Sequence, residues 1–258
     1  MPSIGLVANI YNEVNALPGW LETHLPIFDD VRILHAGPQG KHSDDGTMEL
    51  LEKWRIPVHF TAIDEGFGAI RTEAIRMSPC DWVMILDADE RFHGLLLTMT
   101  CSGESDTQAQ IDQILQSYDF SGVNLPNWEN VGRLGEKLQV RHDLPLYDQM
   151  DRLRALISGP FDALITKRRH WHDLTMKRPT QDWNVHPDWQ LRLVKNLPEV
   201  HYTNRMHEQL QGAKNVLRCS SLFFDHYHFT FKRMEQKQRA HDIRIYNAIN
   251  DGKAPPCT

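Results

Sequence analysis

Two aspartates one residue apart, Asp87 and Asp89, are the residues of this chain best suited to chemistry. They directly follow an apolar run, residues 82–86, of the length of a buried strand. Carboxylates are costly to bury unless a cation, a proton or a donor meets them. Asp-x-Asp offers the hard oxygen ligands that Mg²⁺ or Mn²⁺ prefers, and an ion that also held a diphosphate would explain the pair. The alternative is a solvated turn with two surface acids, since Asp is common in turns.

The segments that must position these acids alternate between strand and helix signals. Each predicted strand is followed by a polar cluster, in residues 9–13, 35–47, 64–71 and 87–91. Repeated strand–helix units predict an α/β fold with a mainly parallel sheet flanked by helices, and ligands collect at the carboxyl ends of such strands. We expect strands over residues 4–10, 31–36, 58–63 and 82–86, and helices over residues 16–25, 45–54 and 67–77.

The pattern is less regular after residue 92. It predicts a helix over residues 106–118, strands over 121–125, 189–194 and 221–224, and a long polar helix over 231–250. Residues 128–187 are rich in charge and aromatics and lack clean periodicity.

Composition places the chain among globular enzymes. It has 258 residues, of which 41% are hydrophobic and 24% charged, so disorder is not expected. Its net charge of −6 argues weakly against a duplex-binding module. The four cysteines form no C-x-x-C pair, which gives a thiolate zinc site no support and suits a reducing compartment. We see neither a signal peptide nor a run of roughly 20 apolar residues, and expect a cytoplasmic protein.

Residues 4–92 resemble the nucleotide-sugar-binding half of a GT-A glycosyltransferase of the family 2 type. Three motifs carry the resemblance: the segment 9–13 after the first strand, the block 66–74 that is similar to G-x-x-x-x-R-N-x-A, and the Asp87-Ala88-Asp89 sequence. Later segments resemble one branch of that family: 188–194, His207-Glu208 and 224–228. Departures are His35, where the family usually has an Asp that reads the base, a stretched segment 42–47, and Thr72 in place of Asn.

The resemblance implies a GT-A (Rossmann-like) fold, with a mixed, mainly parallel sheet flanked by helices, in one continuous domain. Residues 1–92 would bind the donor, residues 93–230 would bind the acceptor and carry catalysis, and residues 231–258 would form a C-terminal helix and tail. The implied donor is a nucleotide-diphosphate sugar, most simply a UDP-sugar, with Mn²⁺ or Mg²⁺. The residues expected to contact the donor are Asn9, Tyr11, Glu13, His35, Asp45, Gly68, Arg71 and Asp87.

The metal would be held by Asp87, Asp89 and a histidine of the last motif. His226 and His228 are two residues apart in an apparent strand and so share a face. The motif favours His226 as the third ligand, and the alternative is that both are packed core histidines. Arg71, near a helix start, would face a phosphate or the base with its forked donor, or be a surface arginine. Glu13 could hydrogen-bond the nucleoside or be an ordinary acid before a helix.

Inverting transfer needs a base that takes a proton from the incoming hydroxyl. Glu208 is our choice and Asp188 the second candidate; the alternative for Glu208 is a helix-start acid. The metal and a nearby cation would stabilise the charge that develops on the departing diphosphate.

The predicted function is therefore a metal-dependent, inverting glycosyltransferase of the hexosyltransferase type. The rivals are a nucleotide-sugar-binding protein without catalysis and a metal-dependent hydrolase. The acceptor is open: a glycan, lipid, protein or other hydroxyl compound, with a modified DNA base possible but not favoured. The basic stretch 167–178 either contacts a phosphate-bearing acceptor or forms a solvated face.

Overall fold

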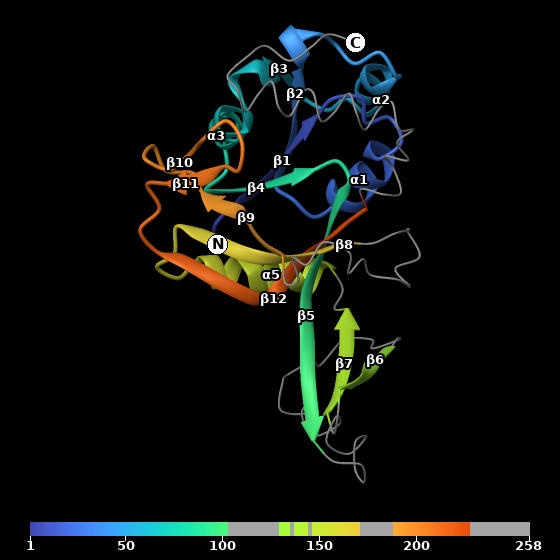
Figure 1. The fold of residues 1–258 in the computed structure, drawn as a ribbon, viewed down its shortest axis with the longest axis vertical. Coiled ribbons are helices and arrows are strands. Elements are labelled where there is room, and N and C mark those ends of the chain that lie inside the picture. Colours follow the sequence, from blue (N-terminus) through green and yellow to red (C-terminus); the bar gives the residue numbers. More distant parts are fainter. Residues whose placement is uncertain (103–128, 135–136, 144–145, 171–187, 228–258) are drawn as a thin grey trace.

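The computed structural model describes residues 1–102, 129–134, 137–143, 146–170 and 188–227 (Figure 1). The expected helix 106–118, strand 121–125 and helix 231–250 lie outside these residues, as does His228. None of the helices in the described ranges is long and apolar enough to cross a membrane.

The N-terminal elements form where the sequence predicts them. The strands are β1 (Ile4–Ile10), β2 (Asp30–Gly37), β3 (Val58–Ala62) and β4 (Trp82–Asp87). The helices are α1 (Leu17–His24), α2 (Thr47–Trp54) and α3 (Phe67–Met77), and two short 3₁₀ turns, η1 (Pro38–Gly40) and η2 (Ile63–Glu65), follow β2 and β3. Apolar runs bounded by Gly, Pro and capping residues account for this agreement.

The second half contains elements that the sequence did not predict. The chain turns straight from β4 into a long strand, β5 (Glu90–Ser102), which the sequence did not predict. It continues through β6 (Glu129–Leu134), β7 (Lys137–Asp143), α5 (Leu146–Ile157) and β8 (Ala163–His170). The predicted strands 189–194 and 221–224 are found as the longer β9 (Asp188–Lys195) and β12 (Val216–His226), with the short pair β10 (His201–Thr203) and β11 (Gln209–Gln211) between them.

One mixed sheet joins the two halves in the order β3-β2-β1-β4-β9-β8-β12-β5-β7-β6. The strands β3, β2, β1 and β4 are parallel to one another, while β9 pairs antiparallel with both β4 and β8. The predicted α/β fold with a mixed sheet and flanking helices is thereby confirmed. Because β4 lies between the parallel strands and β9, its carboxyl end faces both halves of the chain.

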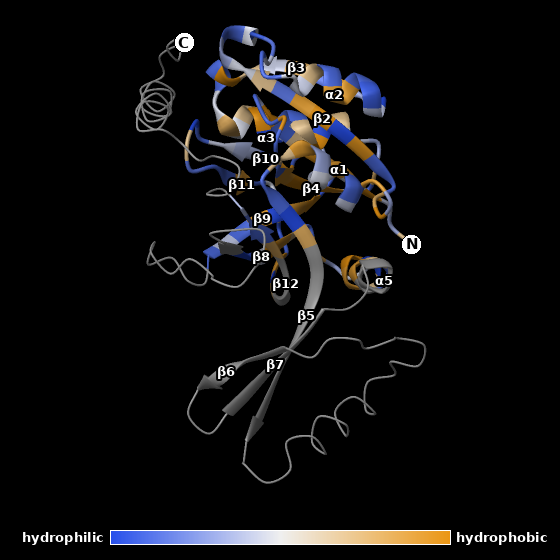
Figure 2. Cartoon of the chain, turned by 90° about the vertical axis from the view of Figure 1, so that its right-hand side faces the viewer, coloured by the Kyte–Doolittle hydropathy of each residue, from blue (hydrophilic) through white to orange (hydrophobic). Residues whose placement is uncertain are grey.

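Two apolar cores cover the faces of this sheet. Alternate residues of β1 divide between them, with Leu6 in one core and Val7 in the other. The first core packs α1, α2 and α5 on the sheet, and the second packs α3 and β10. Figure 2 shows the hydrophobic residues concentrated in the central strands and the helix faces turned toward them. The rigid sheet therefore fixes the position of side chains at the strand ends.

Candidate active site

Asp87 and Asp89 lie in a tight turn between the end of β4 and the start of β5. The strand register places Asp87 beside Asn9 of β1, so the first predicted donor residue and the first aspartate are neighbours. The amide nitrogen and oxygen of Asn9 are both enclosed and have no hydrogen-bond partner among the described residues. Buried amides without partners are uncommon, which marks this position as one that function could explain.

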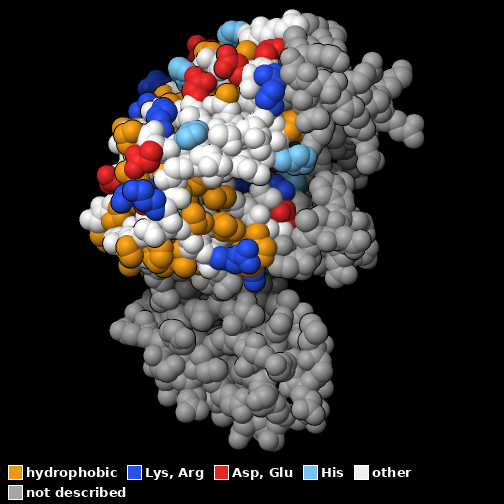
Figure 3. All heavy atoms as spheres, turned by 60° about the vertical axis from the view of Figure 1, so that its left-hand side comes forward, with side chains coloured by type: hydrophobic (Ala, Val, Ile, Leu, Met, Phe, Trp, Pro, Cys, Tyr) orange, Lys and Arg blue, Asp and Glu red, His pale blue; other side chains and the backbone are white. Residues whose placement is uncertain are grey.

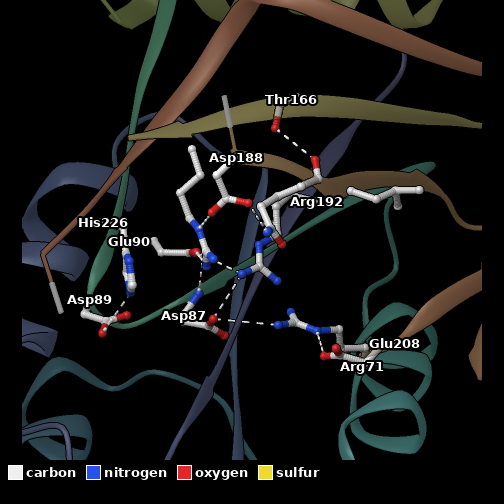
Figure 4. Close-up of polar contacts among 12 residues, drawn as sticks. Arg71, Asp87, Asp89, Glu90, Thr166, Asp188, Arg192, Glu208 and His226 are labelled. Atoms are coloured by element: carbon white, nitrogen blue, oxygen red, sulfur yellow. Dashed lines mark hydrogen bonds and ion pairs between the residues drawn. The ribbon is translucent and has the colours of Figure 1, made fainter. Parts of the chain in front are cut away.

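Asp89 faces His226 across this turn. The distance from Asp89 Oδ2 to His226 Nε2 is 3.4 Å, and both side chains are buried (Figure 4). The pairing of β12 with β5 sets this contact, because His226 lies opposite Glu90 in the register. The Tyr227 backbone N–H donates to the Asp89 carbonyl at 2.8 Å and fixes the turn on β12. The two residues predicted to share a metal therefore meet, although 137 residues of sequence separate them.

Asp87 faces arginines. Its Oδ2 atom is 3.1 Å from Arg192 Nη2 and 3.6 Å from Arg71 Nη2 (Figure 4). Burial acts to raise the pKa of Asp87, but the charges of Arg192 and Arg71 outweigh it and lower that pKa below the ordinary value. Asp87 is therefore ionised at neutral pH.

Glu90, the first residue of β5, is completely buried and was not predicted as a site residue. Its Oε1 atom accepts from Arg192 Nη2 at 2.8 Å and from Arg168 Nη1 at 3.0 Å, and its Oε2 atom accepts from the Asp87 backbone N–H at 3.0 Å. A buried carboxylate with two guanidinium partners and a backbone donor has its charge well compensated. Glu90 thus ties the acidic turn to strands β8 and β9.

Arg192 reaches this position because β9 is irregular there. In the pairing of β8 with β9, Leu193 lies opposite Leu164 and Leu191 lies opposite Ile165, so that Arg192 is skipped. An extra residue of this kind, a β-bulge, redirects its side chain relative to a regular strand. Arg192 is buried, and its guanidinium lies between Asp87 and Glu90.

Glu208, the predicted base, is bound by Arg71. The distance from Arg71 Nε to Glu208 Oε1 is 2.6 Å. Burial acts to raise the pKa of Glu208, but the charge of Arg71 and its hydrogen bond lower that pKa below the ordinary value. The preceding His207 has left-handed backbone, with φ 53°, in the turn that presents Glu208. Glu208 is consequently a carboxylate at neutral pH, the form that a general base requires.

Asp188, the second candidate for the base, is engaged at both oxygens. Its Oδ2 atom accepts from Arg168 Nε and its Oδ1 atom from Gln190 Nε2, each at 2.7 Å. Arg168 belongs to the basic stretch for which we weighed a solvated face, but it is turned inward to Glu90 and Asp188. The alternating acids and arginines form what we call the ion-pair chain, with members Glu208, Arg71, Asp87, Arg192, Glu90, Arg168 and Asp188.

A cavity of about 480 Å³ adjoins the ion-pair chain. Arg71, Arg192 and Glu208 line it together with Trp189 and Arg218. In the order of the sheet it belongs to β9, β8 and β12, on the opposite side of β4 from β1, β2 and β3. The predicted donor residues of β1 and β2 and the cavity therefore flank Asp87 from two sides.

The loops after β1 and β2 are joined by hydrogen bonds. The Asn12 side chain exchanges hydrogen bonds with Asp44, at 3.0 and 3.2 Å. Asp45, predicted to contact the donor, accepts from the Val14 N–H at 3.1 Å and from the Thr47 N–H and hydroxyl at 3.0 and 2.6 Å. The carboxylate of Asp45 thus stabilises the loops that would surround a donor.

Glu13 lies in the same loop, where its backbone N–H donates to the Thr47 hydroxyl at 2.9 Å. Glu13 also acts to raise the pKa of Arg91, but burial of Arg91 dominates and lowers it to about 10. Arg91 donates to the Ala88 and Ala16 carbonyls at 2.6 and 2.7 Å, which joins the acidic turn to the start of α1.

Aromatic rings surround His35 at the end of β2. Tyr11 meets it edge-on at a centroid distance of 5.9 Å, and His42 stacks on Phe60 at 4.7 Å nearby. His35 Nε2 accepts from the Ser43 N–H at 3.0 Å. Burial and the neighbouring His42 lower the pKa of His35, so its ring is neutral at neutral pH. The predicted donor residues Tyr11 and His35 therefore do meet, in a group of rings that includes Phe60 and His42, which were not predicted.

The start of α3 is closed by the chain itself. The Phe67 and Gly68 N–H groups donate to the Arg205 and Asn204 carbonyls at 2.9 and 3.1 Å. A Cβ atom at Gly68 would lie 2.4 Å from the Asn204 carbonyl oxygen, so only glycine allows this approach. Gly68 thus brings the loop before Glu208 close to Arg71, and its backbone N–H is used within the protein.

The arrangement fits a divalent ion held jointly by protein and substrate. The described residues contain no group of three or more His, Cys, Asp or Glu side chains that could hold an ion. Mg²⁺ and, by the same oxygen chemistry, Mn²⁺ are often bound by one or two carboxylates together with substrate phosphates. Asp89 and His226, with Asp87 close by, supply such a partial set.

No protein-family profile and no curated protein sequence match the chain. Among solved structures it is similar to S. aureus TarS 1–349, at 9% identity and a TM-score of 0.43, over 99% of this chain and 67% of that one. It is also similar to glucosyl-3-phosphoglycerate synthase from Mycobacterium tuberculosis in complex with Mg²⁺ and UDP, at 17% identity and a TM-score of 0.29.

The synthase match covers 35% of this chain and 34% of the synthase, so the chain spans only about a third of that protein's length. At these identities and TM-scores the likeness carries no argument about function. Function is therefore inferred from the residues of the site.

Proposed function

We propose that this chain is a metal-dependent glycosyltransferase that moves a sugar from a nucleotide-diphosphate donor, most simply a UDP-sugar, to a hydroxyl acceptor with inversion. The observation that carries the proposal is the turn after β4, where Asp89 meets His226 and Asp87 meets Arg71 and Arg192. An acidic pair beside fixed arginines suits a site where a metal-bound diphosphate departs.

Each residue of the site then has a defined task. Asp89 and His226, with Asp87, would hold the ion, which when bound would neutralise charge on the leaving diphosphate. Arg71 and Arg192 hold Asp87 ionised and in place. Glu208, kept ionised by Arg71, would accept the proton of the acceptor hydroxyl. An acceptor bound in the cavity would attack the sugar from the side opposite the departing diphosphate, as an inverting reaction requires.

The residues predicted for the nucleotide support the donor side. Tyr11 and His35, with Phe60 and His42, offer aromatic surfaces beside the loops held by Asp45. Rings of this kind can stack on a nucleobase. Asn9, whose amide has no partner among the described residues, lies beside Asp87 in the register of β1 with β4, and Glu13 lies in the loop after β1.

A panel of nucleotide sugars, measured by thermal shift with and without Mn²⁺, tests the proposal. A ligand at about 100 times its Kd stabilises the native state by about 2.7 kcal/mol, so a true donor should raise the Tm. We expect the largest rise with Mn²⁺ present, and slow hydrolysis of the same donor in the absence of an acceptor.

The variant Asp89→Asn should abolish the Mn²⁺-dependent rise and the hydrolysis. The matched control is Asp30→Asn, which removes a partly exposed carboxylate at the opposite end of the sheet and should change neither. A donor-induced rise that persists in Asp89→Asn at full size would show that the acidic turn does not hold the ion. Donor binding in the wild-type chain without hydrolysis or transfer would favour the binding protein over the enzyme.

A further inference from the structure

The cavity beside Glu208 has an apolar wall and a cationic rim. Trp189 and Leu191 of β9 and Ile165 of β8 line it together with Arg218 of β12. The register explains why these side chains meet: Ile165 lies opposite both Leu191 and Arg218, and Lys167 lies opposite Trp189. Directly paired residues share a face of the sheet, so the set forms one continuous surface. Figure 3 shows one face of the molecule, on which hydrophobic side chains gather next to basic ones.

The position of Arg218 suits the binding of an anion. Its guanidinium carbon lies 4.9 Å from the centre of the Trp189 ring, and Lys167 Nζ lies 5.4 Å from the same ring. The arginine is exposed, and its only contact given by the described residues is this cation–π contact. An aromatic ring supports the guanidinium plane while leaving its N–H donors open. Arg218 thus differs from Arg71 and Arg168, whose charges are met by acids of the ion-pair chain.

Arg192 adds a second open donor from inside the site. The residue is 4% exposed, and its Nη2 atom bonds both Asp87 and Glu90. Its Nε atom is enclosed without a partner, whereas Nη1 is neither enclosed nor hydrogen-bonded among the described residues. Since Arg192 also lines the cavity, Nη1 is its donor to whatever enters. A buried guanidinium with one open nitrogen can donate a charge-assisted hydrogen bond to an oxyanion.

From these observations we infer that the cavity binds an acceptor carrying an oxyanion, a phosphate or a carboxylate, near the hydroxyl that is glycosylated. Arg218 and Arg192 bind the oxyanion, Trp189 and Leu191 contact the apolar face of the acceptor, and Glu208 accepts the proton of the hydroxyl. This inference rests on the proposed function, because it identifies the bound molecule as the substrate that receives the sugar. The anion site itself rests on the cavity and its arginines.

The decisive experiment measures binding of inorganic phosphate and, separately, of acetate by NMR titration at low ionic strength, where surface charges are least screened. The wild-type chain is compared with Arg218→Gln and with Lys214→Gln. Lys214 is exposed, precedes Arg218 by four residues and does not line the cavity, so it controls for the loss of one positive charge. We expect Arg218→Gln to weaken oxyanion binding about tenfold, which corresponds to about 1.4 kcal/mol. Lys214→Gln should change it less than about twofold.

The two probes separate the sources of the anion. A tenfold loss for phosphate alone assigns a phosphate-bearing acceptor, and a loss for acetate alone assigns a carboxylate. Equal binding of both probes by the wild-type chain and Arg218→Gln would overturn the inference, as would an equal loss in Lys214→Gln. Transfer to glucose 6-phosphate and glucuronate should exceed transfer to glucose in kcat/KM, and equal values would also overturn it.

Donor hydrolysis by the wild-type chain keeps the two proposals apart. Oxyanion binding that depends on Arg218 in a chain that hydrolyses no nucleotide sugar would refute the proposed function and leave the anion site established. Hydrolysis together with oxyanion binding that does not depend on Arg218 would refute the anion site alone.

Discussion

The loops after β1 and β2 and the ion-pair chain are held together by different means. In the loops, hydroxyl, amide and carboxylate side chains bond exposed or half-exposed backbone N–H groups, as in the pairing of Asn12 with Asp44. In the ion-pair chain, the acids and arginines are buried or half-buried, with the Asp87 side chain 35% exposed, and each charge is met by at least one opposite charge. Water can replace a lost partner in the loops but reaches the ion-pair chain poorly.

The two regions should therefore differ in how much stability is lost when one partner of a contact is removed. Breaking a buried pair by removing one partner leaves an uncompensated charge, whereas an exposed hydrogen bond contributes little net stability.

The two regions also differ in how far apart in the sequence the bonded residues are. The loop contacts join residues about 31–34 apart along the chain, while Glu90 meets arginines 78 and 102 residues away. The ion-pair chain therefore couples the acidic turn to strands β8 and β9.

Loss of Glu90 should have the largest effect on stability. Glu90→Gln removes the charge that compensates Arg168 and Arg192 inside the protein, and we expect the free energy of unfolding to fall by about 3–5 kcal/mol. Urea denaturation followed by fluorescence measures it. Glu73→Gln, which removes an acid from the exposed pair with His59, is the control and should cost less than about 1 kcal/mol. Similar losses in the two variants would remove the contrast between buried and exposed contacts.

Loss of Glu208 should mainly affect catalysis. Glu208→Gln keeps the shape of the side chain but cannot accept a proton, so kcat for transfer should fall by about 10²–10⁴-fold while the Kd for the donor changes little. Asp188→Asn is the comparison, because both oxygens of Asp188 are already hydrogen-bonded. A larger fall in kcat for Asp188→Asn than for Glu208→Gln would transfer the role of base to Asp188. A weaker donor Kd with unchanged kcat in Glu208→Gln would contradict a base at that position.

The two regions also differ in how far the sequence predicts them. The strands and helices of residues 4–87 follow from apolar runs and turn residues, which are local signals. The acidic pair Asp87 and Asp89 was found because acids after an apolar strand are unusual, and His226 because a family motif contains it. Glu90 was missed since it follows these acids and resembled a turn residue, whereas it begins a strand that pairs with β12.

Partners distant in sequence could not be assigned from local patterns. Arg192 interrupts an apolar strand, Leu191-Arg192-Leu193-Val194, and a charge in such a run is the signal that could have marked it. The bulge that aims it at Asp87 depends on the register between β8 and β9, which local periodicity does not specify. Arg168 was interpreted within a basic stretch because nothing near it in sequence is its partner.

Acid should weaken the ion-pair chain through Asp87. Its folded-state pKa is lowered, so its contribution to stability is complete above the ordinary pKa of about 4 and is lost as pH falls through the lower folded-state value. We expect the free energy of unfolding of the wild-type chain to fall below pH 4 more steeply than that of Asp87→Asn. The two curves should approach each other in strong acid, measured by urea denaturation at successive pH values. Parallel curves would mean that Asp87 is not stabilised by its arginines.

Loss of Asp45 should have the smallest effect on the free energy of unfolding, and it tests the contacts of the loops after β1 and β2. Its carboxylate accepts from the Val14 and Thr47 backbone N–H groups, the latter at the start of α2, so Asp45→Ala should cost about 1 kcal/mol, the scale of a lost helix cap. Asp44→Ala, which loses only the exposed side-chain contact from Asn12 Nδ2, should cost less than about 0.5 kcal/mol, as is usual for surface substitutions. Because the same loops would surround the donor, Asp45→Ala should also weaken nucleotide-sugar binding, and Asp44→Ala should do so less. A cost for Asp45→Ala as large as that for Glu90→Gln would show that the loops resist water as well as the ion-pair chain does.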